Sequence, residues 1–237
     1  TVRGLAMNFR ETAYASVTAR IAAARLASAY RGEVALVAAS KTQPAVAIRA
    51  LAALGQHAFG ENYVQEALAK QRELADLALE WHMIGPLQSN KCRDVARHFH
   101  WLQSLDRGGL IEPLARWRAP DAMPLNVLVQ VNIDDEASKS GCTPDAVGAL
   151  AAQVVAAHGL RLRGLMAIPA PAADPAYRRD AFRRMRSLFD ALRATHAGID
   201  TLSMGMSDDI EPAIAEGATM VRVGTALFGA RGPKAGR

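Results

Sequence analysis

A regular alternation of short apolar segments with longer stretches of helical periodicity limits the fold of this 237-residue sequence more than any other feature. Several of the apolar segments contain almost no polar residue, which is typical of parallel strands covered by helices. The predicted strands are Val34–Ala39, His57–Phe59, Trp81–Ile84, Trp101–Ser104, Asn126–Asn132, Arg161–Ala167, Thr201–Met204 and Thr219–Val223. Eight strand–helix units in a chain of this length predict an α/β fold of the (β/α)₈ TIM barrel type.

Helices are predicted between these strands, and one more before the first. The extra N-terminal helix is expected over Glu11–Tyr30, where apolar residues recur at helical spacing. The others are expected at Pro44–Leu54, Tyr63–Leu77, Asn90–His98, Pro144–Ala157, Tyr177–Thr195 and Asp209–Glu216. A doubly wound open sheet has the same alternation, but a glycine-rich dinucleotide-binding sequence does not follow the first strand. Residues 1–237 are therefore expected to form one barrel domain, with Pro169–Pro175 as a loop after the sixth strand.

Composition narrows the class of protein. Apolar residues make up 50% of the sequence, yet they form no run long enough to cross a bilayer, and Thr1–Arg10 lacks the apolar core of a secretory signal. The two cysteines, Cys92 and Cys142, have no metal-binding spacing, so two reduced thiols and no metal site are predicted. These features indicate a cytoplasmic protein without a membrane partner.

The formal charge of +5 comes from arginines spread along the chain. The densest cluster lies on one predicted helix and comprises Arg178, Arg179, Arg183, Arg184 and Arg186. Few aromatic residues accompany it, so a solvated helix face is favoured over a nucleic-acid-binding surface.

Lys41 follows the first predicted strand directly, where the apolar run ends at Ser40. The sequence has only five lysines against 23 arginines, which makes a lysine at this position unusual. Burial lowers the pKa of a lysine until its neutral, nucleophilic amine is present, and such an amine forms a Schiff base with an aldehyde. The alternative is a lysine at a strand end that simply reaches solvent.

The segments after the last two strands carry an anion-binding signal. Ser207 precedes the helix that is expected from Asp209, and Gly224 and Thr225 follow the eighth strand. A glycine at such a turn lets the backbone approach a ligand closely, and TIM barrels often bind phosphate at this place. Ordinary turn and capping chemistry is the alternative for either segment alone.

Arg222 is expected to point into the barrel. In Met220–Val223 the strand alternation places the two valines on one face, and Met220 and Arg222 on the other. A buried guanidinium needs acceptors or an anion, which leaves pairing with Glu61 or with a ligand as alternatives. An amine, a phosphate-binding turn and an interior arginine together suggest an aldehyde-bearing phosphate ester, and pyridoxal 5′-phosphate (PLP) has both groups.

Seven segments, in order along the chain, resemble the pyridoxal phosphate homeostasis protein family. They are Ala39–Thr42, Phe59–Glu66, Trp81–Lys91, Ser138–Gly141, Arg163–Ile168, Ser203–Asp209 and Val221–Gly229. The resemblance implies a barrel like the N-terminal domain of alanine racemase, with PLP bound through Lys41. It also implies that Ser207, Gly224 and Thr225 hold the phosphate, that Arg222 faces the pyridine nitrogen, and that Asn62 and Met166 line the ring pocket. Lys91 and Lys139 also lie in family motifs. Each is either a secondary site for the cofactor or a simple surface residue.

Binding of PLP is favoured over catalysis for two reasons. In the alanine racemase family, the acid–base group opposite the lysine is a tyrosine on a second domain and partner subunit. No second domain is expected here, and Tyr14, Tyr30, Tyr63 and Tyr177 all fall on predicted helices. An arginine facing the ring nitrogen disfavours its protonation and weakens the ring as an electron sink. The predicted function is therefore a monomeric carrier and buffer of PLP in vitamin B6 homeostasis, which delivers the cofactor to apo forms of PLP-dependent enzymes. A low-efficiency amino-acid racemase and a Schiff-base aldolase are the alternatives.

Overall fold

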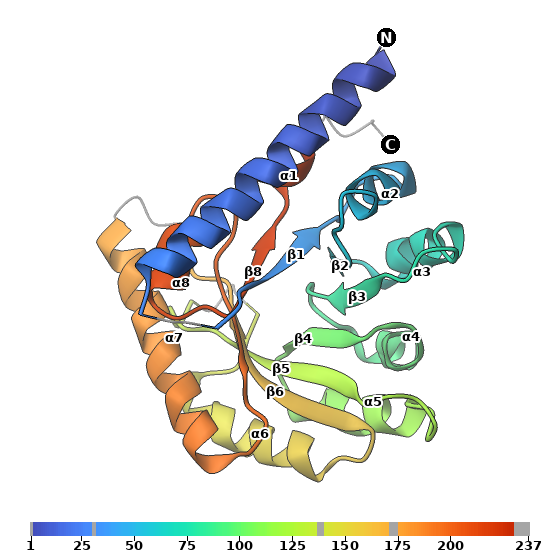
Figure 1. The fold of residues 1–237 in the computed structure, drawn as a ribbon. Helices are drawn as coiled ribbons and strands as arrows, with labels where there is room; N and C mark the ends of the chain where they lie inside the picture. The colour runs from blue at the N-terminus through green and yellow to red at the C-terminus, as the bar shows by residue number, and fades with distance from the viewer. Residues whose placement is uncertain (1, 30–31, 137–139, 171–174, 230–237) are drawn as a thin grey trace.

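A computed structural model describes residues 2–29, 32–136, 140–170 and 175–229. Its strands form one closed barrel in sequence order, and each pairs in parallel with its neighbours (Figure 1). The strands are β1 (Ala35–Ala39), β2 (Ala58–Glu61), β3 (Glu80–Met83), β4 (Trp101–Leu105), β5 (Leu125–Val131), β6 (Leu160–Ala167), β7 (Thr201–Ser203) and β8 (Met220–Val223). The predicted TIM barrel is confirmed, and each strand lies within two residues of its predicted bounds.

Helices surround the barrel, and most of them follow the prediction. They are α1 (Val2–Ala27), α2 (Ala45–Ala52), α3 (Val64–Glu73), α4 (Cys92–His98), α5 (Ile111–Trp117), α6 (Val147–Ala156), α7 (Pro175–Thr195), α8 (Ile210–Ala215) and α9 (Thr225–Phe228). Helix α1 begins at Val2, nine residues before the predicted start at Glu11. Helix α5 was not predicted; it contains Pro113, which a helix accepts in its first turn because the N–H there has no intrahelical partner. Residues 171–174 of the predicted loop lie outside the described residues.

Two apolar cores lie on opposite sides of the strands. The larger one fills the space between the barrel and its helices, and it includes Val221 and Val223 of β8. The smaller one lies inside the barrel and consists of Val37, Trp101, Leu128, Met166 and Met220. This division confirms that Met220 and Arg222 face inward, as the alternation along β8 predicts.

A bulge in β6 brings Met166 into the inner core. Leu162 belongs to the outer core and Met166 to the inner one, although four residues of regular strand would leave both on the same face. The pairing with β5 shifts by one residue at Gly164, which has φ +146°. A Cβ at Gly164 would lie 2.0 Å from the Thr201 carbonyl oxygen, so only glycine fits this bulge.

Helix α1 lies across the side of the barrel beside α8 and α9 (Figure 1). Its Val17 and Ile21 are buried in the outer core. Arg20 forms a bidentate ion pair with Glu211 of α8. The extra helix is therefore packed against the segments that follow β7 and β8.

Candidate functional site

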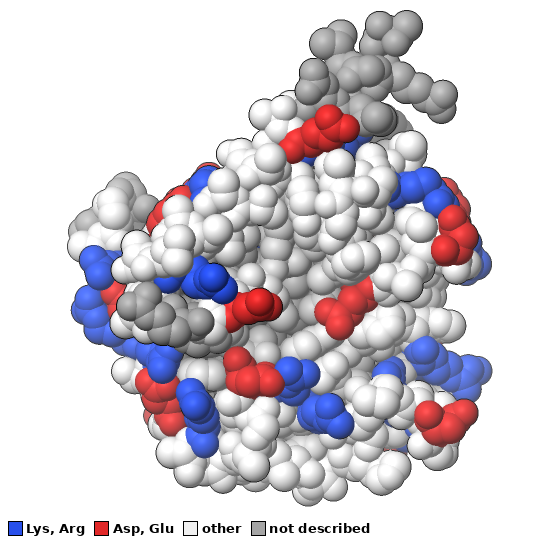
Figure 2. Space-filling model, in the orientation of Figure 1, with Lys and Arg blue, Asp and Glu red and all other residues white. Residues whose placement is uncertain are grey.

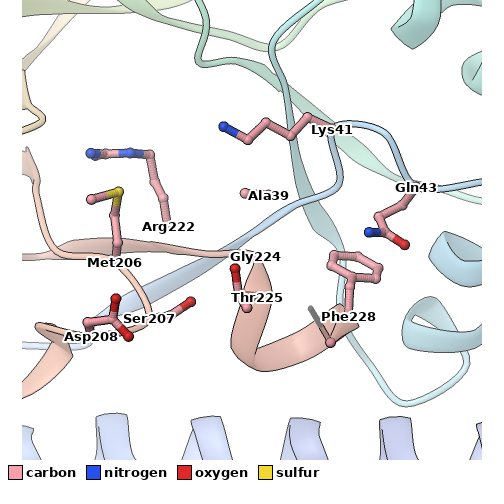
Figure 3. A pocket seen from close by; sticks show the side chains of 11 residues that line it. Ala39, Lys41, Gln43, Met206, Ser207, Asp208, Arg222, Gly224, Thr225 and Phe228 are labelled. Carbon is pink, nitrogen blue, oxygen red and sulfur yellow. The ribbon is translucent and has the colours of Figure 1, made fainter. Parts of the chain in front are cut away.

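A cavity of about 210 Å³ opens at the carboxyl ends of β1, β7 and β8. It is lined by Ala39, Lys41, Gln43, Met206, Ser207, Asp208, Arg222, Gly224, Thr225, Phe228 and Gly229. In Figure 3 the amine end of Lys41 and the guanidinium of Arg222 extend into the same space, with the hydroxyls of Ser207 and Thr225 below them. Five of the seven predicted cofactor-binding residues thus line one cavity.

The other two predicted residues lie elsewhere on the barrel. Asn62 lines a neighbouring cavity of about 170 Å³, between the ends of β2, β3, β5 and β6. Met166 is fully buried in the inner core. Of the two further lysines, Lys91 is half-buried at the end of a short 3₁₀ turn, and Lys139 lies outside the described residues.

The two predicted phosphate-binding turns are joined to each other. The backbone N–H of Ala226 donates to Ser207 Oγ at 3.3 Å, so Ser207 bridges to the turn after β8 and does not cap α8. Asp209 precedes α8 and accepts from the Met206 N–H at 2.5 Å. Burial raises the pKa of Asp209, and Arg178 pairs with its carboxylate at 3.3 Å.

Arg20 supports the same turn from α1, a role that no sequence motif indicates. Its Nη1 donates to the Ser207 carbonyl oxygen at 3.0 Å, while its other nitrogens bind Glu211. The two residues are separated by 187 positions in the sequence, so no local motif reveals the contact. The N-terminal helix is therefore connected to the predicted phosphate site.

Arg222 is anchored inside the barrel by uncharged acceptors. Its Nη1 donates to Ser203 Oγ at 2.5 Å and its Nη2 to the Ala167 carbonyl oxygen at 2.8 Å. Burial lowers the pKa of Arg222 to about 10, which leaves the guanidinium charged at neutral pH. The alternative pairing with Glu61 is not formed, because Glu61 binds Lys70 and Ser40 on the outside of β2.

A row of polar side chains continues from Arg222 across the barrel interior. Ser203 Oγ donates to Gln103 Oε1 at 2.7 Å, and Gln103 Nε2 lies 2.8 Å from His82 Nδ1. Since the amide nitrogen donates, His82 Nδ1 accepts, and its Nε2–H is left to donate to Glu80 Oε1 at 2.8 Å. Burial lowers the pKa of His82, which is consistent with this neutral tautomer.

The arginine cluster on α7 is paired with carboxylates. Arg178, Arg179 and Arg183 pair with Asp209 or Glu216, and Arg184 and Arg186 pair with acidic residues as well. In Figure 2, Lys and Arg side chains gather along the edge where α7 lies, with acidic side chains among and beside them. This agrees with the solvated helix face that the sequence favours.

Two further sequence expectations concern cysteines and membranes. Cys92 and Cys142 are free and buried, and burial raises the pKa of Cys142 to about 11. Among the described residues, no helix combines the length and apolar character that a membrane span requires.

Comparison with known proteins defines the class first. The family model of the alanine racemase N-terminal domain matches residues 16–232. The alanine racemase of Corynebacterium glutamicum shares the fold with a TM-score of 0.64 at 19% identity, over 93% of this chain and 63% of that one.

More similar relatives define the group within that class. The pyridoxal phosphate homeostasis protein of Pseudomonas aeruginosa is 56% identical over 92% of this chain and 94% of its own length. The structure of PipY from Synechococcus elongatus PCC7942 with PLP bound is similar with a TM-score of 0.75 at 40% identity, over 82% of this chain and 92% of that one. The chain belongs to the pyridoxal phosphate homeostasis protein family, as its sequence motifs indicate.

Proposed function

We propose that this protein binds PLP reversibly and acts as a carrier and buffer of the cofactor in vitamin B6 homeostasis. The observation that carries the proposal is that Lys41, Arg222 and both polar turns line one cavity. PLP is both an aldehyde and a phosphate ester, so an amine and an anion-binding turn in one cavity match its two reactive ends. The homeostasis protein of P. aeruginosa and PipY with PLP bound support the same assignment.

Each lining residue has a role that its position supports. Lys41 binds the aldehyde covalently, and Ser207, Gly224 and Thr225 hold the phosphate. A Cβ at Gly224 would lie 3.2 Å from the Ala39 carbonyl oxygen and 3.4 Å from the Ala39 Cβ, so glycine lets the turn after β8 lie close to the end of β1. Arg222 faces the pyridine nitrogen. Asn62, which lines the neighbouring cavity, and Met166, which belongs to the inner core, contact the pyridine ring.

The arrangement favours holding the cofactor over efficient catalysis. Bound PLP supplies an electrophilic aldehyde and a ring that withdraws electrons best when its nitrogen is protonated. A charged Arg222 opposes that protonation, and Ser203 and Ala167 fix the arginine in place.

The described lining of the cavity holds no counterpart of the acid–base tyrosine of the alanine racemase family, and its acidic side chain is that of Asp208. Tyr14 and Tyr177 lie in helices, Tyr63 directly precedes α3 with 61% of its surface exposed, and none of them lines the cavity. Racemisation needs such a group on each face of the substrate, so we expect a non-catalytic protein. We further expect it to be a cytoplasmic monomer, formed from a single domain, that delivers PLP to apo-enzymes.

Titration tests this function directly. PLP should produce a saturable change in visible absorbance at one equivalent per chain, and pyridoxal, which lacks the phosphate, should bind more weakly. Absence of saturable binding of PLP would contradict the proposal.

A further inference from the structure

A buried ionic cluster lies behind the cavity, on the outside of β2 and against α3. Lys70 of α3 is its centre and is only 6% exposed. Its Nζ donates to the Ser40 carbonyl oxygen at 2.9 Å, to Glu61 Oε1 at 2.8 Å and to Glu66 Oε1 at 2.5 Å. A lysine buried to this extent requires such partners, because a charged group without them is costly to remove from water.

The two carboxylates of the cluster also bind the residues on either side of Lys41. Glu61 Oε1 accepts from the Ser40 hydroxyl at 2.6 Å, and Glu66 Oε1 accepts from the Thr42 backbone N–H at 2.7 Å. Lys70 itself holds the carbonyl of Ser40. Both neighbours of Lys41 are therefore fixed by one ammonium group and its two carboxylates.

The backbone at this point needs such support. Thr42 has φ +65°, a left-handed conformation that is rare for a β-branched residue. A conformation of this kind persists only where surrounding contacts determine it, and it is most often found at functional sites. The contact from Glu66 to the Thr42 N–H is one that determines it here.

The charge balance of this cluster suggests that it has a role beyond stabilising the fold. Lys70 contributes one positive charge against two carboxyl groups, and Glu61 Oε2 is buried without a hydrogen-bond partner in the part of the chain that the structure describes. Burial raises the pKa of Glu61, which reflects the cost of its position. Well-packed apolar residues often stabilise a fold as well as a buried ion pair does, so a purely structural cluster has no clear advantage.

We propose that Lys70 is a positioning residue, which acts through Glu61 and Glu66 to hold Ser40–Thr42 so that the Lys41 amine is presented to the aldehyde. The proposal rests on the function proposed above. In the capture step, the lone pair of the neutral Lys41 amine attacks the aldehyde carbon. A C=N bond replaces C=O, the oxygen leaves as water with the two amine protons, and nothing is oxidised or reduced. Misplacement of the amine slows this step without removing the phosphate contacts.

Two ligands separate positioning from simple loss of structure. PLP requires capture by Lys41, whereas pyridoxine 5′-phosphate carries an alcohol in place of the aldehyde and binds only non-covalently. In Lys70→Met, covalent capture of PLP should be slower by about tenfold or more, because the amine is no longer held. Binding of pyridoxine 5′-phosphate should change by less than about twofold, since Ser207, Gly224 and Thr225 are untouched.

Two more variants complete the experiment. Glu66→Ala removes the acceptor of the Thr42 N–H from a side chain that is 30% exposed, so it tests the same idea if Lys70→Met does not fold. Arg49→Gln is the matched control, because it breaks an ion pair between α2 and Asp76 after α3 without touching Ser40–Thr42. Capture by this control should equal that of the parent.

The outcomes distinguish the explanations. Slower capture with retained pyridoxine 5′-phosphate binding in Lys70→Met or Glu66→Ala supports the proposal. Unchanged capture, or equal losses for both ligands, overturns it and leaves the cluster a structural role. If the parent protein does not capture PLP covalently, the function proposed for Lys41 is wrong, and the role proposed for Lys70 is wrong as well.

Discussion

Ser203 accepts a hydrogen bond from Nη1 of Arg222 at 2.5 Å, and this contact joins the mouth of the barrel to its interior. Ser203 in turn donates to Gln103, and the polar row continues through His82 to Glu80 at the start of β3. The arginine that faces the cavity is therefore held by side chains from three other strands. Its orientation is fixed before any ligand binds.

Replacement of Ser203 by alanine should destabilise the protein. The change leaves Arg222 without one acceptor and Gln103 Oε1 without its donor, both in buried positions. We expect the free energy of unfolding to fall by about 1–3 kcal/mol in urea denaturation. Ser187→Ala on the exposed face of α7 is the control and should stay within about 0.5 kcal/mol of the parent. Equal stability of both variants would show that the polar row contributes nothing.

The pH dependence of stability should show the effect of His82. Burial lowers its pKa in the folded state, whereas the unfolded chain takes up a proton below about pH 6.5. The neutral His82 is therefore fully compatible with folding above about pH 6.5. As the pH falls from 6.5 toward the lowered pKa of the folded state, protonation of the unfolded chain reduces the free energy of unfolding. His82→Gln does not titrate, so its stability relative to the parent should improve between about pH 7 and pH 5. A constant difference across this range would contradict the buried neutral histidine. Burial also lowers the pKa of His100, but His100 is present in both proteins, so its effect on stability cancels in the difference.

Gly224→Val should weaken PLP binding more than pyridoxal binding. The added side chain would press on Ala39 and so displace the turn whose backbone N–H groups we propose to hold the phosphate. Thr225, whose side chain lines the same cavity, offers a second position for a bulkier residue. Affinities for the two ligands, measured by absorbance titration, provide the comparison. If both ligands lose affinity equally, the phosphate is bound elsewhere.

Arg20→Met should reduce the affinity for PLP, although Arg20 is not predicted to contact the cofactor. The variant removes the donor to the Ser207 carbonyl and thereby loosens the turn. Arg49→Met removes an ion pair of similar exposure with Asp76, which does not involve that turn, and should leave the affinity unchanged. An effect of the same size in both variants would indicate a general effect of charge.

The barrel could be predicted from sequence because each apolar strand ends abruptly at polar residues. Lys41, Ser207, Gly224 and Thr225 follow such ends, so topology alone brings them together. The inward direction of Arg222 followed from alternation, because β8 pairs without a bulge.

The remaining features depend on contacts between distant parts of the chain. Met166 faces the interior only because of the bulge at Gly164, which a simple alternation does not include. Arg20 and Lys70 reach the site from helices 187 and 30 positions away from their partners Ser207 and Ser40. Short motifs do not reveal the contacts to Ser207 and Ser40, so the supporting role of Arg20 and Lys70 emerges only from the folded chain.

The central claim is that Lys41 is the covalent attachment point of PLP. Borohydride reduction of the PLP-loaded protein, followed by peptide mapping with mass spectrometry, tests it most directly. We predict that the reduced adduct lies on Lys41 at about one equivalent per chain, and that Lys41→Ala loses this adduct and the visible absorbance while it keeps its fold. An adduct on Lys70 or Lys91 in the parent, or undiminished adduct formation in Lys41→Ala, would contradict the account.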